Sequence, residues 1–304
     1  MQSRDRLITL SRVGTVSGQG RVEQLEGMDL RALQLFEKAY RAEVAGYIAS
    51  EVGSLAVTYG WRVAALTGLP VVDAPCNGRA HPLGLMGSLG LHRFPDHITL
   101  TTAAGRHVEL VIRSNVQTAA RRIRRAVARH RAGLAVVRNP LPVAYIRRHA
   151  AVGALGYARR IGEELLRNRP SGVRPVLHAL SRLMRGRVLA RGFIKSAELT
   201  EKNGFSIGHI AIRSEVGRPV VLPVCNEYMM AIDGNDVIAA FPDLITLFDE
   251  ETALPLNSSD AGALRRVVVF CVARQYLPLA STMNDHRLLE GVERLLKIRF
   301  QAAA

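Results

Sequence analysis

Apolar positions in the first hundred residues switch between strand-like and helical spacing. Short apolar runs at 7–10 and 46–49 predict two strands. An amphipathic helix is predicted over 29–43, with Asp29 as its N-cap, and a second helix over 56–66 is ended by a glycine. Helices that alternate with short strands in this way are typical of a layered α/β domain.

The stretch from 69 to 82 combines an apolar run with a loop rich in reactive side chains. The run at 69–72 predicts a buried strand, and open α/β sheets place ligands at the carboxyl ends of such strands. Glu51 follows the preceding predicted strand at a corresponding position. The loop holds Asp73, Cys76, Asn77, Arg79 and His81. The alternative is an ordinary turn in which Asp73 and Asn77 cap backbone groups, and the pattern leaves both interpretations open.

Between residues 97 and 184 the pattern predicts a hairpin, an amphipathic helix, a short strand and two further helices. In chain order these elements lie at 97–112, 115–131, 134–137, 152–166 and 173–184. The hairpin is expected to turn at Ala104-Gly105, and Asn139-Pro140 is expected to halt the strand that precedes it. The arginines of the long helix lie largely off its apolar face.

From Gly186 onward, short apolar runs are separated by glycine, proline and Asp-Gly turns, as in a β-rich layer or barrel. The runs lie at 187–199, 205–212, 220–224, 229–232, 237–241 and 264–272, and a final helix is predicted at 288–298. Asn226-Glu227 separates two of these runs. Since an unpaired buried carboxylate is costly, Glu227 is either a paired structural group or a site residue facing a pocket. Asp243 is expected to cap or brace a turn.

These patterns predict an α+β protein of two domains. An α/β amino-terminal domain is expected over 1–115, and a carboxy-terminal domain over 116–304. The carboxy-terminal domain is expected to be helical over 116–185 and β-rich over 186–304. A chain of 304 residues with 48% hydrophobic content is large enough to bury two cores.

Positive charge is concentrated in the middle of the chain. The formal net charge is +15, and from Leu110 to Ala197 twenty basic residues accompany two acidic ones. A basic region can bind nucleic acid, but no aromatic residues interleave with the arginines and no nucleic-acid motif is present. We therefore expect a solvated or subunit-facing surface without a specific nucleic-acid partner, which leaves a homo-oligomer open.

Cysteine usage and hydropathy bear on the compartment. The three cysteines are far apart, with neither a disulfide framework nor a zinc-binding spacing, which favours a reducing environment. No apolar core of signal-peptide length stands at the amino terminus, and no segment approaches the roughly 20 apolar residues of a membrane helix. The sequence predicts a cytoplasmic protein without a membrane partner.

Several blocks, in order, resemble the S-methyl thiohydantoin desulfurase family, which is linked to hydantoinase and oxoprolinase proteins. The blocks are Glu51-Val52-Gly53, Gly68 to Ala74, Gly78-Arg79-Ala80, Arg191 to Ile194, Gly204-Phe205 with Gly208, Asn226-Glu227, Asp233-Gly234, Pro242 to Ile245, and Asp249 with Glu251-Thr252. The resemblance covers roughly residues 45 to 275 and depends on the order of the blocks rather than on any one motif.

The resemblance implies a site between an α/β domain and a β-rich domain. It implies that water replaces a methylthio group on a small cyclic thiohydantoin- or hydantoin-like substrate, releasing methanethiol. The reaction needs a base for water and a stabiliser for developing charge. By position, Asp73 or Glu227 would be the base, and Arg79 would bind a carboxylate or ring carbonyl. Further candidates for substrate contact are Glu51, Asn77, His81, Asn226 and Asp243.

The sequence leaves open whether the site holds a metal ion and whether it has a nucleophilic cysteine. Asp73, His81 and Glu227 could hold a divalent metal, although no ligand spacing supports one. Cys76 could be a nucleophile, but no sequence feature supplies an activating base, which favours a plain buried thiol.

The chain also departs from the family pattern. The family's opening glycine-rich segment has no counterpart, so the chain is expected to be shortened at the front. Pro75 and Leu83 stand where the family has acidic residues, and His81 stands where it has an aromatic residue. The sequence therefore supports two functions: a hydrolase, and a diverged member that binds a small molecule or regulates a partner without catalysis.

Overall fold

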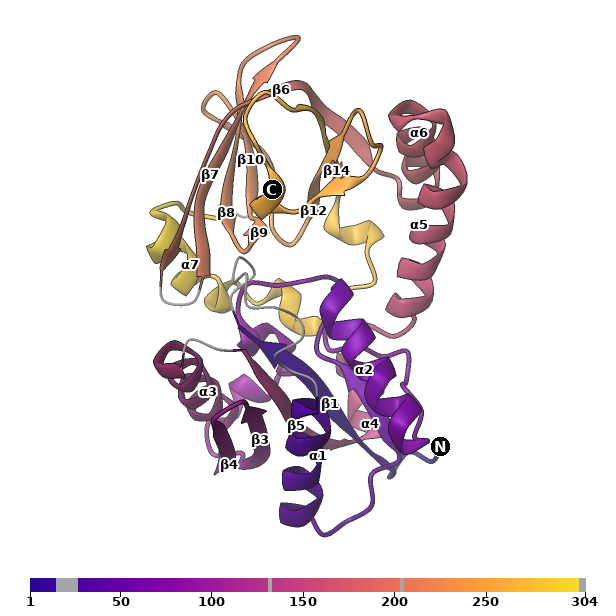
Figure 1. Cartoon of the computed structure of the whole chain (residues 1–304), viewed down its shortest axis with the longest axis vertical. Coiled ribbons are helices and arrows are strands. Elements are labelled where there is room, and N and C mark those ends of the chain that lie inside the picture. The colour runs from indigo at the N-terminus through magenta and orange to yellow at the C-terminus, as the bar shows by residue number, and fades with distance from the viewer. Residues whose placement is uncertain (15–26, 131–132, 203–204, 301–304) are drawn as a thin grey trace. The chain divides into compact units, whose positions relative to one another are not determined.

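The computed structural model describes residues 1–14, 27–130, 133–202 and 205–300, and the chain divides into two compact units (Figure 1). Unit 1 comprises Met1–Leu155 and Pro278–Leu288, and unit 2 comprises Gly156–Leu277 and Leu289–Ala304. Each unit has its own sheet and its own hydrophobic core. The α+β, two-domain class predicted from the sequence is confirmed.

Unit 1 is built on a mixed sheet, which within the described residues has five strands in the order β2-β1-β5-β3-β4. Strands β1 and β2 are parallel, as a connection through a helix requires, and the other neighbours are antiparallel. The strands are β1 (Arg6–Val13), β2 (Gly46–Ala49), β3 (Thr99–Gly105), β4 (Val108–Ser114) and β5 (Leu134–Pro142).

Helices cover both faces of this sheet (Figure 1). On one face, α1 and α2 bury Phe36 and Val63 against Ile8 of β1. On the other face, α3 buries Ile123 against Val136 of β5. The helices are α1 (Met28–Ala39), α2 (Ser54–Thr67), α3 (Val116–His130) and α4 (Val143–His149), and 3₁₀ turns lie at η2 (Gly84–Gly87), η3 (Leu91–Arg93), η7 (Ser281–Asn284) and η8 (His286–Leu288).

Unit 2 contains an antiparallel sheet with nine strands among its described residues, in the order β11-β10-β8-β7-β6-β14-β12-β13, with β9 beside β8. Its strands are β6 (Arg187–Lys202), β7 (Phe205–Ser214), β8 (Val220–Cys225), β9 (Glu227–Tyr228), β10 (Met230–Asp233), β11 (Asp236–Ala240), β12 (Leu244–Asp249), β13 (Pro255–Leu256) and β14 (Arg266–Val272). Helix α6 (Val173–Met184) buries Leu177 and Leu180 against Phe248 and Phe270. The remaining α-helices of the described residues are α5 (Ala154–Asn168) and α7 (Glu290–Leu296).

The prediction of a strand at 69–72 is wrong. Only Val71 forms a bridge, to Tyr47 of β2 in parallel register, although the Pro70 carbonyl also accepts the Tyr47 N–H at 2.9 Å. Pro70 has no N–H to donate and lies exposed, so the ladder does not extend past this contact. The segment still runs beside β2 and delivers the loop that follows.

Helix α1 begins and ends earlier than predicted. Its N-cap is Gly27 rather than Asp29, and the helix ends at Ala39 rather than near residue 43. Asp29 is buried in the first turn, where it forms an ion pair with Arg62 of α2. The carboxylate therefore joins two helices and does not cap the end of one.

Two turns also differ from the prediction. The hairpin of β3 and β4 turns at Arg106-His107, because the alanine and glycine expected there belong to β3. Strand β5 does not stop at Asn139-Pro140 but passes through these residues as a bulge. Gly204 and the last residue of the helix predicted at 115–131 lie outside the described residues.

The predicted domain boundary between residues 115 and 116 stays a prediction, and the compact units divide at another point. Strand β5 follows that boundary in sequence but pairs with β1 and β3, so it belongs to the sheet of unit 1. Over the part of the chain that the structure describes, none of the helices combines the length and the apolar character needed to span a bilayer.

Candidate functional site

The Asp73–His81 loop lies beside the carboxyl end of β2. The N–H of Cys76 donates to the carbonyl of Ala49, the last residue of β2, at 2.9 Å. Glu51 follows that strand, so the loop and Glu51 come from neighbouring segments of the same parallel arrangement. Glu51 and the loop therefore emerge beside each other at the carboxyl end of β2, although the second segment is not a full strand.

A carboxylate, an imidazole and a guanidinium meet at this edge. Nε2 of His81 lies 3.2 Å from Oε2 of Glu51, and their side chains are 4% and 27% exposed. A Cβ atom at Gly87 would lie 3.5 Å from Nε2 of His81 and 3.3 Å from Nη2 of Arg138, so both groups border the space above this glycine. Gly87, in η2, permits the approach because it has no side chain.

Burial controls the protonation of this cluster. Burial, together with the nearby charges of Arg138 and Arg79, lowers the pKa of His81 to about 3. The imidazole is therefore neutral at physiological pH. Burial also lowers the pKa of Arg138, while the Glu51 carboxylate opposes that shift. The Glu51 side chain keeps contact with solvent, which suits a group that exchanges protons with water.

Arg138 was not predicted as a site residue from the sequence. It lies in β5, more than fifty residues after the loop, and only the pairing of β5 with β1 brings it to the cluster. A signal was nevertheless present, because an arginine in an otherwise apolar strand is costly to bury unless it has a role.

Cys76 is a buried thiol. Its side chain is fully buried, and its Sγ lies 3.4 Å from Oγ1 of Thr9. Burial raises the pKa of Cys76 to about 11, so the thiolate is scarce at neutral pH. The geometry matches the plain-thiol interpretation of the sequence.

Asn77 and Gly78 connect the loop to the return segment Pro278–Leu288. The buried Asn77 amide lies 3.3 Å from the Thr282 hydroxyl, which also donates to the Met86 carbonyl at 2.7 Å. A Cβ atom on Gly78 would come within 1.7 Å of the Pro278 carbonyl oxygen. Only glycine therefore permits this close approach between the loop and the return segment.

Asp73 and Arg79 have structural contacts within unit 1. Oδ1 of Asp73 accepts the N–H of Leu155 at 2.7 Å in the first turn of α5, which is the backbone-capping role weighed from the sequence. Arg79 is 4% exposed, and its Nε donates to the Ala80 carbonyl at 3.2 Å. Their assignment as base and substrate anchor stays a prediction.

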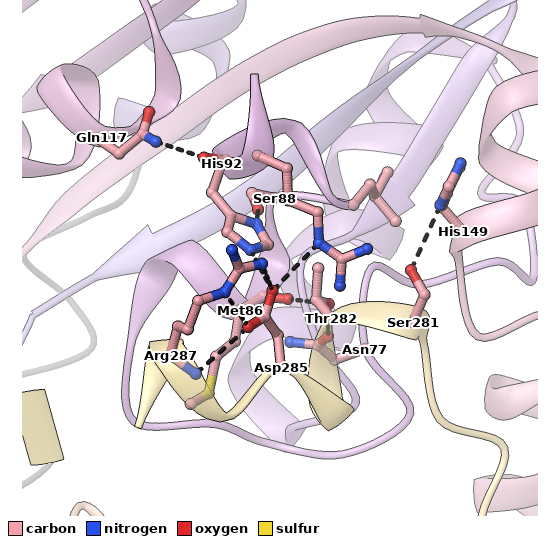
Figure 2. A network of polar contacts seen from close by, with 12 residues as sticks. Asn77, Met86, Ser88, His92, Gln117, His149, Ser281, Thr282, Asp285 and Arg287 are labelled. Carbon is pink, nitrogen blue, oxygen red and sulfur yellow. Dashed lines mark hydrogen bonds and ion pairs between the residues drawn. The ribbon is translucent and has the colours of Figure 1, made fainter. Parts of the chain in front are cut away.

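A second polar network in unit 1 centres on Asp285 (Figure 2). Oδ2 of Asp285 lies 2.9 Å from Nε2 of His92, whose Nδ1 lies 3.0 Å from Oγ of Ser88. Asp285 also accepts hydrogen bonds from Arg93 and Arg287. These bonds, that of Arg287 above all, lower the pKa of Asp285, so its carboxylate is ionised and fixes the orientation of His92.

The predicted residues of unit 2 lie at turns. Asn226 has a left-handed backbone with φ of 61°, and its Oδ1 accepts the Ser206 N–H at 2.9 Å. Glu227 follows in β9 and is partly buried. Oδ1 of Asp243 accepts the N–H of Arg274 at 2.9 Å, so Asp243 braces a turn as expected. Whether these residues contact substrate stays a prediction.

Metal ligands do not gather in the described part of the chain. Within those residues, no group of three or more histidine, cysteine, aspartate or glutamate side chains has a geometry that could hold a metal ion.

These features define a two-domain α+β protein with a buried polar cluster in its α/β unit. The family described as "S-Me-THD-like, C-terminal domain" matches residues 113–277, more than half of the chain, and the chain belongs to this family. The chain is also similar to the crystal structure of a protein from Chromobacterium violaceum, solved by a structural genomics consortium. The TM-score is 0.71 at 21% identity, over 97% of this chain and 82% of the other. This likeness shows the fold, and no curated protein matches the chain.

Proposed function

We propose that the protein is a hydrolase of small cyclic thiohydantoin- or hydantoin-like substrates. The observation that carries the proposal is the trio of Glu51, His81 and Arg138, in which a partly exposed carboxylate borders a buried, neutral imidazole and a buried guanidinium. Membership of the S-Me-THD-like family supports the substrate class.

In the proposed reaction, water attacks the ring carbon that carries the methylthio group. Glu51 accepts a proton from the water, and Arg138 stabilises the negative charge that develops on the ring. The carbon–sulfur bond breaks, and methanethiol leaves with one proton of the water. The ring gains a carbonyl, and the neighbouring ring nitrogen takes the other proton. His81 orients the Glu51 carboxylate. Glu51 suits the base role better than Asp73, because one oxygen of Asp73 already accepts a backbone N–H.

The test measures methanethiol release or ring opening across a panel of S-methyl thiohydantoins and hydantoins, with and without divalent metal ions. Glu51→Gln is expected to lower kcat by about 10²-fold or more with KM little changed, since it removes the base and keeps the shape. Glu43→Gln, an exposed carboxylate in the same unit, is the matched control and should leave kcat unchanged. Asp73→Asn and Glu227→Gln test the two bases predicted from the sequence.

The second candidate is a family member that binds a small cyclic molecule without turning it over. The replacement of two acidic family positions by Pro75 and Leu83 favours this function. Binding of a panel compound without turnover, both with and without metal, would refute the hydrolase and support the binding protein.

A further inference from the structure

Unit 1 contains a cavity of about 320 Å³ between helix α3 and the sheet. This volume lies within the range of pockets that hold small molecules. The apolar part of its wall is formed by Val13, Val116, Ala119, Ile123 and Val136, and the polar part includes Ser88, Gln117, Arg138 and Asn139. The wall therefore suits a ligand with an apolar body and a polar end.

The bulge in β5 brings two successive polar residues to this wall. Leu7 of β1 pairs with Leu141 and Thr9 pairs with Arg138, so two residues of β5 stand opposite one residue of β1. Asn139, one of the two, has a left-handed backbone with φ of 56°. In a regular strand Asn139 would face away from Arg138, but here both line the cavity.

Buried hydrogen-bonding atoms around the cavity have no partner among the described residues. They are Nε of Arg138, Oε1 of Gln117, and both Nδ2 and Oδ1 of Asn139. Buried polar atoms in native proteins are nearly always hydrogen-bonded, so several unpaired atoms at one cavity favour a polar ligand there. Two of these groups are donors and two are acceptors, which is the complement of an amide with its carbonyl and its N–H.

The charge around the cavity favours an anion. Among the described residues of its wall, Arg121, Arg124 and Arg138 are cationic and none is acidic. Gln117 lies in the first turn of α3, where the helix dipole is positive. Burial lowers the pKa of Arg138 by more than the Glu51 carboxylate opposes, so a further anion would stabilise its guanidinium there.

The network around Asp285 orients two of the polar groups in advance (Figure 2). Nε2 of Gln117 donates to the His92 carbonyl at 2.6 Å, which leaves its Oε1 unpaired at the cavity. The His92 ring, held by Asp285, contacts the Ser88 hydroxyl at 3.0 Å. Side chains fixed in this way lose little freedom when a ligand binds.

We propose that this cavity is a binding site for a small anionic amide. The apolar body of the ligand packs against α3, and its carbonyl accepts from Arg138 and Asn139. Its N–H donates to the free oxygen of Asn139 or Gln117, and its carboxylate lies in the field of the three arginines. Arg138 also has a role in the proposed hydrolysis, but this proposal is tested by binding rather than by turnover, so it can fail or hold independently of that reaction.

The test is isothermal titration calorimetry with hippurate (N-benzoylglycine), which carries a phenyl ring, an amide and a carboxylate. Its methyl ester removes the charge, and 4-oxo-4-phenylbutanoate replaces the N–H with a methylene group. We expect hippurate to bind and each analogue to bind about tenfold more weakly or worse, the effect of losing one strong hydrogen bond or charge pair. Equal affinity for the ester would overturn the anionic class, and equal affinity for the ketone would overturn the amide class.

Protein variants locate the binding. Arg138→Gln should weaken hippurate about tenfold or more, and Arg122→Gln, an exposed arginine of α3 outside the cavity wall, should have no effect. Ala120→Phe fills the cavity from a partly exposed position and should abolish binding even if Arg138→Gln does not fold. No binding of hippurate to the intact protein at about 5 mM, or binding that survives Ala120→Phe, would overturn the proposal.

Discussion

Asp285 is predicted to contribute more to the stability of unit 1 than any surface ion pair there. Its side chain is 5% exposed, and the His92 ring that it contacts is 8% exposed, so this buried bond is worth about 1.5–3 kcal/mol. Arg93 and Arg287 are 44% and 70% exposed, which limits each to roughly 0.2–1 kcal/mol through solvent screening. Asp285→Asn keeps the size and removes the charge, and it is expected to lower the free energy of unfolding by about 2–5 kcal/mol.

The assay is urea denaturation followed by far-UV circular dichroism, with Asp96→Asn as the control at an exposed aspartate of the same unit. The lowered pKa of Asp285 fixes the pH dependence. Its contribution is complete above the unfolded-state value of about 3.9 and is lost as pH falls towards the lower folded-state value. The two proteins should therefore differ fully at pH 7 and converge only in strong acid. A loss below about 1 kcal/mol at pH 7, or one equal to that of Asp96→Asn, would refute the reasoning.

Three further predictions follow from unit 1 and from one helix of unit 2. Gly78→Ala should lower the melting temperature and reduce the free energy of unfolding by about 1–3 kcal/mol, because the new Cβ atom would clash with the Pro278 carbonyl. Gly162→Ala in α5 is the control: its Cβ atom would contact nothing, so the change should be neutral or stabilising. Cys76 should resist iodoacetamide at pH 7.5 in the native protein and react after denaturation, as mass spectrometry would show; rapid native labelling would contradict its burial. The pKa of His81 is lowered in the folded protein, so its contribution to stability is complete above about pH 6.5 and declines as pH falls towards 3. The melting temperature of His81→Gln should therefore fall less between pH 6.5 and 5 than that of the parent protein. An unchanged slope would contradict this.

Local pattern was sufficient for most helices and strands. The helix at Val173–Met184 and the strand at Gly46–Ala49 have the predicted bounds, since each carries a clear periodicity between glycines or polar residues. The pattern failed at 69–72 because apolarity does not report whether backbone N–H groups are available for pairing. It failed at Asn139-Pro140 because a bulge admits two residues that a regular strand would exclude.

The candidate site was predictable only in part. The loop and Glu51 were found because polar residues follow apolar runs, and the sequence correctly kept open the capping role of Asp73. Arg138 and the Asp285–His92 contact were missed, because strand pairing places the first and the return segment supplies the second, and local spacing encodes neither. Long-range pairing of this kind is visible only once the topology is known.

The discontinuity of unit 1 has a consequence for biosynthesis. Asn77 contacts Thr282, and His92 contacts Asp285, so about two hundred residues must be translated after the first partner of each pair before the second is available. At roughly 5–20 residues per second, this leaves the nascent α/β unit incomplete for about 10–40 seconds. During that interval the strands of unit 2 can already pair with one another, since nearly all of that unit lies within the intervening sequence. Most of unit 2 can therefore form before unit 1 is complete, although unit 1 begins earlier in the chain.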